Sequence, residues 1–148
     1  MEQWLKGDTR REWRELGFFY DRDDASKEWL LVGSRDGLLR FAGLLRAYVA
    51  DPRNATRSEH DHYGPYTYLE LMTWPKAGID GHAICGPLAA LDGLASLVEA
   101  KVGAMKPGAR ARIGDEFAPG TSYTIVLELR DDGFEPSSID PNLEGDAG

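Results

Sequence analysis

The sequence predicts an α+β fold: a largely antiparallel sheet, two main helices on one face of it, and a short N-terminal helix. Three observations predict this class. Two apolar stripes have helical spacing, and runs with period-two alternation flank each stripe. The two helix-containing segments also align with each other without gaps, at an offset of 53 residues. We therefore expect an internally duplicated ββα-type unit, with repeats at about 28–72 and 81–129.

The repeat is clearest around the two stripes. Residues 31–49 read LVGSRDGLLRFAGLLRAYV, and residues 84–102 read ICGPLAALDGLASLVEAKV. In both copies the apolar residues recur at i, i+3, i+4, i+7 and i+11, which places them on one face of a helix. Gly33 aligns with Gly86, and most apolar positions align as well. So many matched positions indicate duplication rather than coincidence.

Start and stop signals set the predicted helices at 35–50 and 87–105. Ser34 or Asp36 can cap the first, and Pro87 suits the first turn of the second. Prolines follow both helices within a few residues and mark their ends. A further short helix is expected at 9–16. Alternating apolar, β-branched and aromatic residues predict strands. We place them near 17–22, 28–33, 66–74, 80–86, 110–117 and 121–130.

Composition limits the class of protein. The 148 residues suit a single domain, which we place at 1–133, and net charge is −8. The lone Cys85 excludes an internal disulfide, and we see neither a signal peptide nor a membrane span. These features predict a cytoplasmic protein that binds neither membrane nor nucleic acid, because acidic surfaces repel phosphate. Residues 134–148 form an acidic tail rich in Pro, Gly and Ser, which we expect to be partly disordered.

The stretch RSEHDHYGPY raises the question of a metal site. On a strand, the side chains of His60 and His62 would point the same way and could reach one ion. A third ligand has to come from elsewhere, with His82 or Cys85 as the nearest chemical candidate. The alternative is that two polar histidines simply lead into a strand, and we favour it. No cofactor is therefore predicted, and any metal would be held by the two histidines.

Signs of catalysis are weak. Glu70 and Glu128 take similar places in the strand sequences YTYLELM and YTIVLEL, which also suits alternation with a solvent-facing side. Neither a nucleophile elbow, nor a phosphate loop, nor a dinucleotide fingerprint is present in the sequence. An enzyme is not the favoured interpretation.

Aromatic residues crowd the segment 63–74. If the leucines at 69 and 71 face the helices, the tyrosine face is exposed, and exposed tyrosine and tryptophan are typical of protein interfaces. Two alternatives stay open: the N-terminal segment with Trp4 and Trp13 covers this face, or a homodimer buries it. The predicted partner-binding residues are His60, His62, Tyr63, Tyr66, Tyr68, Glu70 and Trp74.

The segment HYGPYTYLELMTWPKAGIDGHAICGPLAALDGLASLVEA resembles small bacterial α+β proteins, some of which are immunity proteins of polymorphic-toxin systems. The resemblance covers roughly residues 62–130, and its motifs are structural. It implies a domain that binds and blocks a cognate toxin, with no transferable active site. Together with the acidic charge, it favours a non-enzymatic binding protein whose acidic, aromatic surface covers a basic toxin domain. A metal-binding protein or metal-assisted enzyme using the two histidines is the alternative, and a self-associating structural protein is the second alternative.

Overall fold

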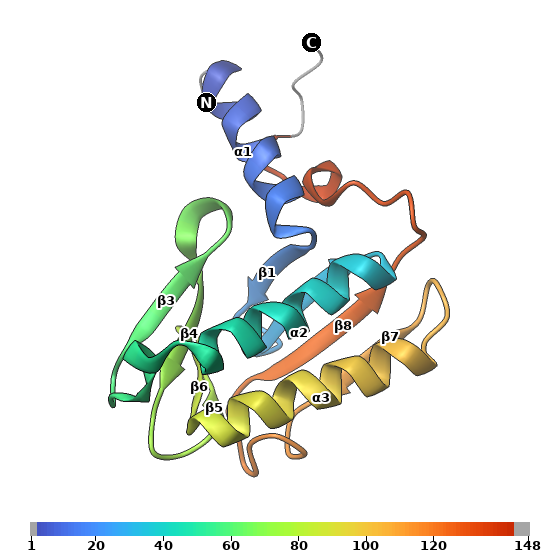
Figure 1. Ribbon diagram of the computed structural model, residues 1–148. Helices are drawn as coiled ribbons and strands as arrows, with labels where there is room; N and C mark the ends of the chain where they lie inside the picture. The colour runs from blue at the N-terminus through green and yellow to red at the C-terminus, as the bar shows by residue number, and fades with distance from the viewer. Residues whose placement is uncertain (1–2, 144–148) are drawn as a thin grey trace.

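The computed structural model describes residues 3–143, which fold into helices, strands and short 3-10 turns (Figure 1). In chain order the elements are α1 (Gln3–Leu16), β1 (Phe19–Asp23), β2 (Glu28–Gly33), α2 (Arg35–Ala50), η1 (Pro52–Ala55), β3 (His60–Tyr63), η2 (Pro65–Thr67), β4 (Leu69–Thr73), β5 (Gly78–Ile79), β6 (Ile84–Gly86), α3 (Leu88–Ala104), β7 (Arg110–Ile113), β8 (Thr124–Leu129) and η3 (Pro136–Ile139). The α+β class is thereby confirmed.

The strands form two four-stranded sheets rather than the one predicted sheet. Their orders are β1-β2-β8-β7 and β3-β4-β6-β5. The central pairs β2–β8 and β4–β6 are parallel, and the outer pairings are antiparallel, so the pairing is largely antiparallel as expected. Two sheets arise because the two hairpins of each repeat belong to different sheets. The hairpins β1–β2 and β7–β8 form one sheet, and β3–β4 and β5–β6 form the other. Such exchange depends on contacts distant in sequence, which local patterns do not encode.

The duplicated unit is ββαββ, and it occurs in two copies: β1-β2-α2-β3-β4 and β5-β6-α3-β7-β8. Leu31 pairs with Leu127, and its counterpart Ile84 pairs with Leu71. Between β2 and β6 the offset is therefore 53 residues, as in the helices, whereas between β4 and β8 it is 56. In this register Glu128 corresponds to Met72, so the expected match between Glu70 and Glu128 is wrong by two residues. A slip of one residue puts a side chain on the opposite face of a sheet, and a slip of two keeps the face but shifts the position.

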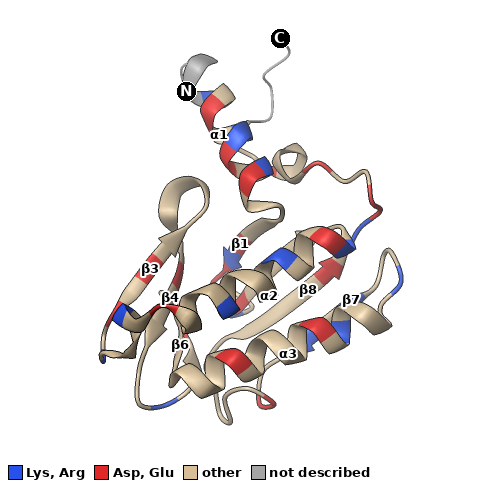
Figure 2. Cartoon of the chain, in the orientation of Figure 1, with Lys and Arg blue, Asp and Glu red and all other residues tan. Residues whose placement is uncertain are grey.

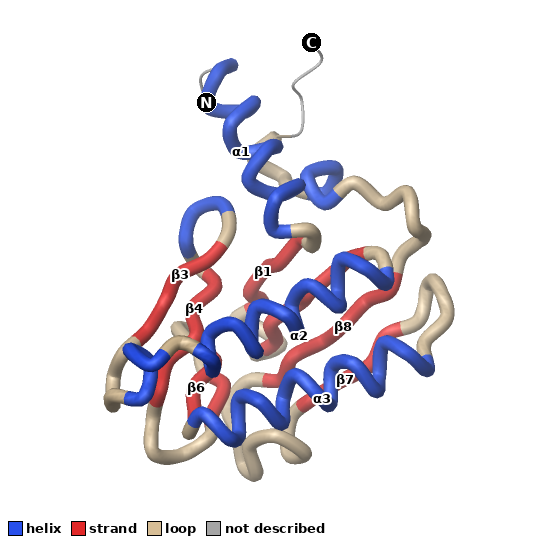
Figure 3. Tube along the Cα trace, in the orientation of Figure 1, coloured by secondary structure: helices blue, strands red, loops and turns tan. Residues whose placement is uncertain are grey.

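Helices α2 and α3 lie side by side, run in opposite directions and cover one side of the strands, as predicted (Figures 1 and 3). Ser34 caps α2, because its hydroxyl accepts a hydrogen bond from the Gly37 amide at 3.1 Å. Arg46 on α2 forms ion pairs with Asp92 and Glu99 on α3. Residues 46 and 99 are 53 apart, so this ion pair joins equivalent positions of the two repeats.

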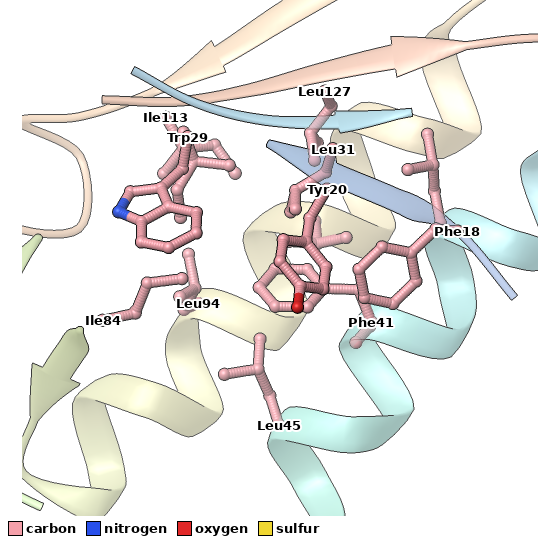
Figure 4. Close-up of a cluster of buried hydrophobic side chains, with 14 of the residues drawn as sticks. Phe18, Tyr20, Trp29, Leu31, Phe41, Leu45, Ile84, Leu94, Ile113 and Leu127 are labelled. Carbon is pink, nitrogen blue, oxygen red and sulfur yellow. The ribbon is translucent and has the colours of Figure 1, made fainter. Parts of the chain in front are cut away.

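The core lies between the helices and the sheets. Figure 4 shows apolar side chains from both repeats meeting there, with Phe41 and Leu45 from α2, Leu94 from α3, and Trp29 and Ile84 from β2 and β6. All five are essentially excluded from solvent. Burial of each such side chain is worth about 1.5–3 kcal/mol, which explains why the helical stripes and the alternating strands are so regular. The Trp29 indole also donates to the Asp80 carbonyl at 2.8 Å and so links the two sheets.

The segment after β8 belongs to the folded domain. It turns back across the molecule to α1, where η3 contacts both α1 and β1. Asp140 and Leu143 are buried. The domain, which was predicted to stop at 133, therefore extends to at least residue 143, because polar and apolar side chains of this segment pack on the rest of the fold. Residues 144–148 lie outside the described residues, as does the side chain of Trp4.

Candidate functional site

A cavity of about 430 Å³ lies beside β1, an edge strand of its sheet. This volume is in the usual range for a ligand pocket. Its walls are aromatic and come from parts of the chain far apart in sequence: Trp13, Phe19, Tyr20, Trp29, Tyr66 and Tyr68. The polar lining consists of Asp21, Arg22, Asp140 and Asn142. We call this cavity the aromatic pocket.

The Tyr20 hydroxyl holds the β3–β4 hairpin against β1. It donates to the Pro65 carbonyl and accepts from the Tyr68 amide at 3.2 Å. Burial raises the pKa of Tyr20 to about 12, so the phenol keeps its proton at neutral pH. Gly64 makes the close approach possible, because a Cβ there would lie 2.6 Å from the Tyr20 ring. Its φ of +75° also favours glycine.

Tyr66 and Tyr68 do not continue a strand as predicted. Tyr66 lies in η2 with φ +67°, a left-handed conformation that is costly for a residue with a side chain. Its ring packs edge-on against Trp13 at a centroid distance of 6.3 Å, so the N-terminal segment covers part of this half-buried tyrosine. Tyr68 is 67% exposed. The leucines at 69 and 71 are fully buried, as the alternation predicted.

Asp140 supplies a buried carboxylate to the pocket and is only 2% exposed. Its Oδ2 accepts hydrogen bonds from Trp13 Nε1 at 2.8 Å and from the Tyr66 hydroxyl at 2.7 Å. Its Oδ1 accepts from the Asn142 amide at 2.8 Å. All three donors are neutral, and none of the lysines or arginines among residues 3–143 forms an ion pair with Asp140. Burial and the Asp140 hydrogen bond together raise the pKa of Tyr66 to about 12.

The one basic side chain at the pocket is occupied elsewhere. Arg22 forms an ion pair with Asp24 at 2.9 Å and donates to the Gly81 carbonyl. Asp21, also in the lining, is exposed. A cavity with aromatic faces and two carboxylates suits a cation, because the ring quadrupole and the acidic groups both attract positive charge. The described lining contains no serine, cysteine, histidine or lysine.

The other predicted residues lie away from the pocket. Trp74, at the far end of β4, is 37% exposed, and the Arg57 guanidinium lies over its ring at 4.4 Å. Tyr63 is half-buried, and burial raises its pKa. The predicted set is therefore divided: Tyr66 and Tyr68 reach the pocket, whereas Trp74 belongs to another part of the surface.

His60, His62 and Glu70 form a separate cluster, in which the three candidate ligand atoms all lie within 4.8 Å of one another. His62 Nε2 is 3.1 Å from Glu70 Oε1. Sequence reasoning looked to His82 or Cys85 for a third ligand, but the cluster contains neither, because Glu70 lies directly opposite His62 in the β3–β4 register. Burial raises the pKa of the Cys85 thiol, which keeps it protonated.

Glu128 has a structural role. Its carboxylate binds Arg110 at 2.7 Å and Arg130 at 2.6 Å. Burial alone would raise the pKa of Glu128, but the two arginines outweigh this effect, and the pKa is lowered.

Charges on the helices are mixed: Figure 2 shows acidic and basic residues interspersed along α1, α2 and α3.

Sequence reasoning missed the residues that make the pocket. Tyr20 and Trp29 resembled ordinary strand residues, and Asp140 was one acid among several in a tail. The only available signal was the high tryptophan and tyrosine content near the N-terminus. Tyr20, Trp29 and Asp140 lie apart in sequence, so their convergence depends on the fold.

Comparisons with protein-family models, with curated proteins and with solved structures find no match to this chain. The resemblance to immunity proteins therefore stays a prediction. In the part of the chain that the structure describes, no helix is long and apolar enough to cross a membrane.

Proposed function

We propose that this protein is a non-enzymatic binding module that holds a cationic side chain of a basic protein partner in the aromatic pocket. The observation that carries the proposal is the buried Asp140 carboxylate, which is set among aromatic rings and, within residues 3–143, bound by neutral donors alone. A negative charge in a low-dielectric site attracts a cation more strongly than an exposed one does. The surrounding rings add cation–π attraction of about 0.5–2 kcal/mol.

Lysine or arginine is the natural occupant. Both have a long apolar stem that can lie along aromatic walls, and a charged end that can approach carboxylates. Tyr68 at the rim is well exposed and is positioned to contact such a residue first. An immunity-type inhibitor, which would cover a basic toxin domain, is the specific form of this proposal that the sequence resemblance favours.

Self-association is less favoured as the role of this surface. A homodimer was expected to bury the tyrosine face; Tyr68 of that face is exposed, but Tyr66 already packs against Trp13 and is bound to Asp140 within one chain. Coverage by a second copy is therefore unnecessary for it.

The proposal is tested first with small probes. Trp13 and Trp29 line the pocket, so tryptophan fluorescence can follow titration with N-acetylarginine amide and with its neutral analogue N-acetylnorleucine amide. We expect the cation alone to bind saturably. Tyr68→Ala should weaken its binding about two- to fivefold, the size of one exposed cation–π contact.

Trp74→Ala is the matched control, because it also removes an exposed aromatic ring but lies outside the pocket. It should leave probe affinity unchanged. Equal binding of the neutral analogue, or equal loss in the two variants, would contradict the proposal. For the immunity form, a purified basic partner enzyme should lose activity at a one-to-one ratio, and Tyr68→Ala should reduce that inhibition.

A further inference from the structure

Three metal-ligating side chains meet on the face of sheet β3-β4-β6-β5 opposite its buried leucines. His60 and His62 are two residues apart on β3, so their side chains leave the same face. Glu70 on β4 is the register partner of His62, and its side chain leaves that face too. The two imidazole centroids are 5.3 Å apart, with the rings perpendicular.

Both imidazoles are held in the tautomer that a metal requires. His60 Nδ1 lies 3.0 Å from the Ser58 carbonyl, and His62 Nδ1 lies 3.0 Å from the Thr67 carbonyl. A carbonyl oxygen only accepts, so each Nδ1 must carry the proton. Each Nε2 is then the nitrogen left for a ligand. This is the arrangement found in protein metal sites, where a ligating histidine donates its other N–H to a carbonyl or carboxylate.

Glu70 brings negative charge that no basic side chain neutralises. Its side chain is only 12% exposed, and none of the lysines and arginines among residues 3–143 forms an ion pair with it; the group beside it is His62, whose Nε2 lies 3.1 Å from its Oε1. A largely buried carboxylate normally has a lysine or arginine partner, or a cation. Here the adjacent groups are two oriented imidazoles, so a cation bound by all three would complete the cluster.

We propose that His60, His62 and Glu70 form a binding site for a divalent first-row transition metal, with zinc as the best match. Two nitrogens and one carboxylate oxygen suit zinc, whereas magnesium and calcium prefer oxygen ligands alone. Tetrahedral zinc needs ligand atoms about 3.3 Å apart. The His62–Glu70 distance already satisfies this, and the cluster places one ring nitrogen of each histidine and one Glu70 oxygen within 4.8 Å of one another, so such atoms need to approach by at most about 1.5 Å.

The site would be open on one side. His60 and His62 are both exposed, so the fourth position faces solvent and would hold water or a group of another molecule. The Thr67 carbonyl that orients His62 belongs to η2, next to Tyr68 of the aromatic pocket. The two sites are nevertheless made of different residues, so each can be removed alone.

The test uses full-length protein without a histidine tag and measures zinc binding by calorimetry, with cobalt absorption as a second readout. We expect one zinc per chain and a tetrahedral cobalt spectrum. His60→Ala, His62→Ala and Glu70→Gln should each weaken zinc binding at least about 100-fold, since even changes outside the ligand shell cost about 10- to 100-fold. His82→Ala is the control, because it removes the third histidine, which is outside the cluster.

Circular dichroism checks that each variant is folded, and the exposed His60→Ala is the variant least able to disturb the core. Wild-type affinity in a folded His60→Ala and a folded His62→Ala would overturn the proposal. So would equal losses in those variants and in His82→Ala, or a wild-type protein that binds no zinc. Tyr68→Ala should keep zinc binding, which separates this result from the test of the pocket.

Discussion

Tyr66→Phe tests how strongly the C-terminal segment is attached through Asp140. The substitution removes one hydroxyl and keeps the ring against Trp13. Asp140 then loses one of three hydrogen bonds while remaining buried. A hydrogen bond to a charged group contributes about 1.5–3 kcal/mol, and the loss should lie toward the upper end because water reaches Asp140 poorly.

The magnitude can be measured by urea denaturation and by thermal unfolding. For a domain of this size the loss corresponds to a fall in Tm of about 3–12 °C. Tyr68→Phe is the control: it removes the same hydroxyl two residues away, from a side chain that is 67% exposed. Its effect should be within about 0.5 kcal/mol of zero. If the two variants have the same free energy of unfolding, the Asp140 anchor contributes nothing and the reasoning is refuted.

Two further predictions concern stability. Gly64→Ala should destabilise the protein by more than about 2 kcal/mol in urea denaturation, because the new Cβ would lie 2.6 Å from the Tyr20 ring and φ is +75°. Gly108→Ala is the control: its φ is +93° but the space around it is open, so the free energy of unfolding should fall by only about 1 kcal/mol. Equal losses in the two variants would show that the contact between the hairpin and Tyr20 does not matter. Glu128 has a folded-state pKa below its ordinary value of 4.5, so its ion pairs stabilise the fold above that pH and this contribution is lost as pH falls through the lowered pKa. Thermal unfolding from pH 7 to pH 3 should therefore show a steeper acid loss in wild type than in Glu128→Gln, and parallel curves would contradict this assignment.

Local patterns in the sequence were sufficient for the helices and most strands. Helix α2 was predicted with its observed bounds, because its apolar stripe and the Ser34 cap depend only on residues within a turn or two. Strand β3 was missed and taken as loop. Its sequence, HDHY, is polar, and it forms a strand because β4 offers it a partner.

The candidate sites were predictable only in part. Tyr66 and Tyr68 were identified because aromatic residues are concentrated around them, yet their surroundings were wrong, since η2 interrupts the strand. His60 and His62 were recognised as a pair by their spacing. Glu70 joined them only through the antiparallel register, which is set by a turn and by the burial of the leucine face.

The sequence by itself determined the α+β class, the duplication and the two helical faces, because these follow from periodicity over short stretches. Tertiary structure alone decided that the halves exchange hairpins to make two sheets, and that Asp140 returns from the C-terminal segment to Trp13 and Tyr66. The physical reason is the range of the interactions. Helical and strand propensities act between near neighbours, whereas the pairing of β2 with β8 and the shared buried carboxylate depend on complementarity between segments more than 70 residues apart.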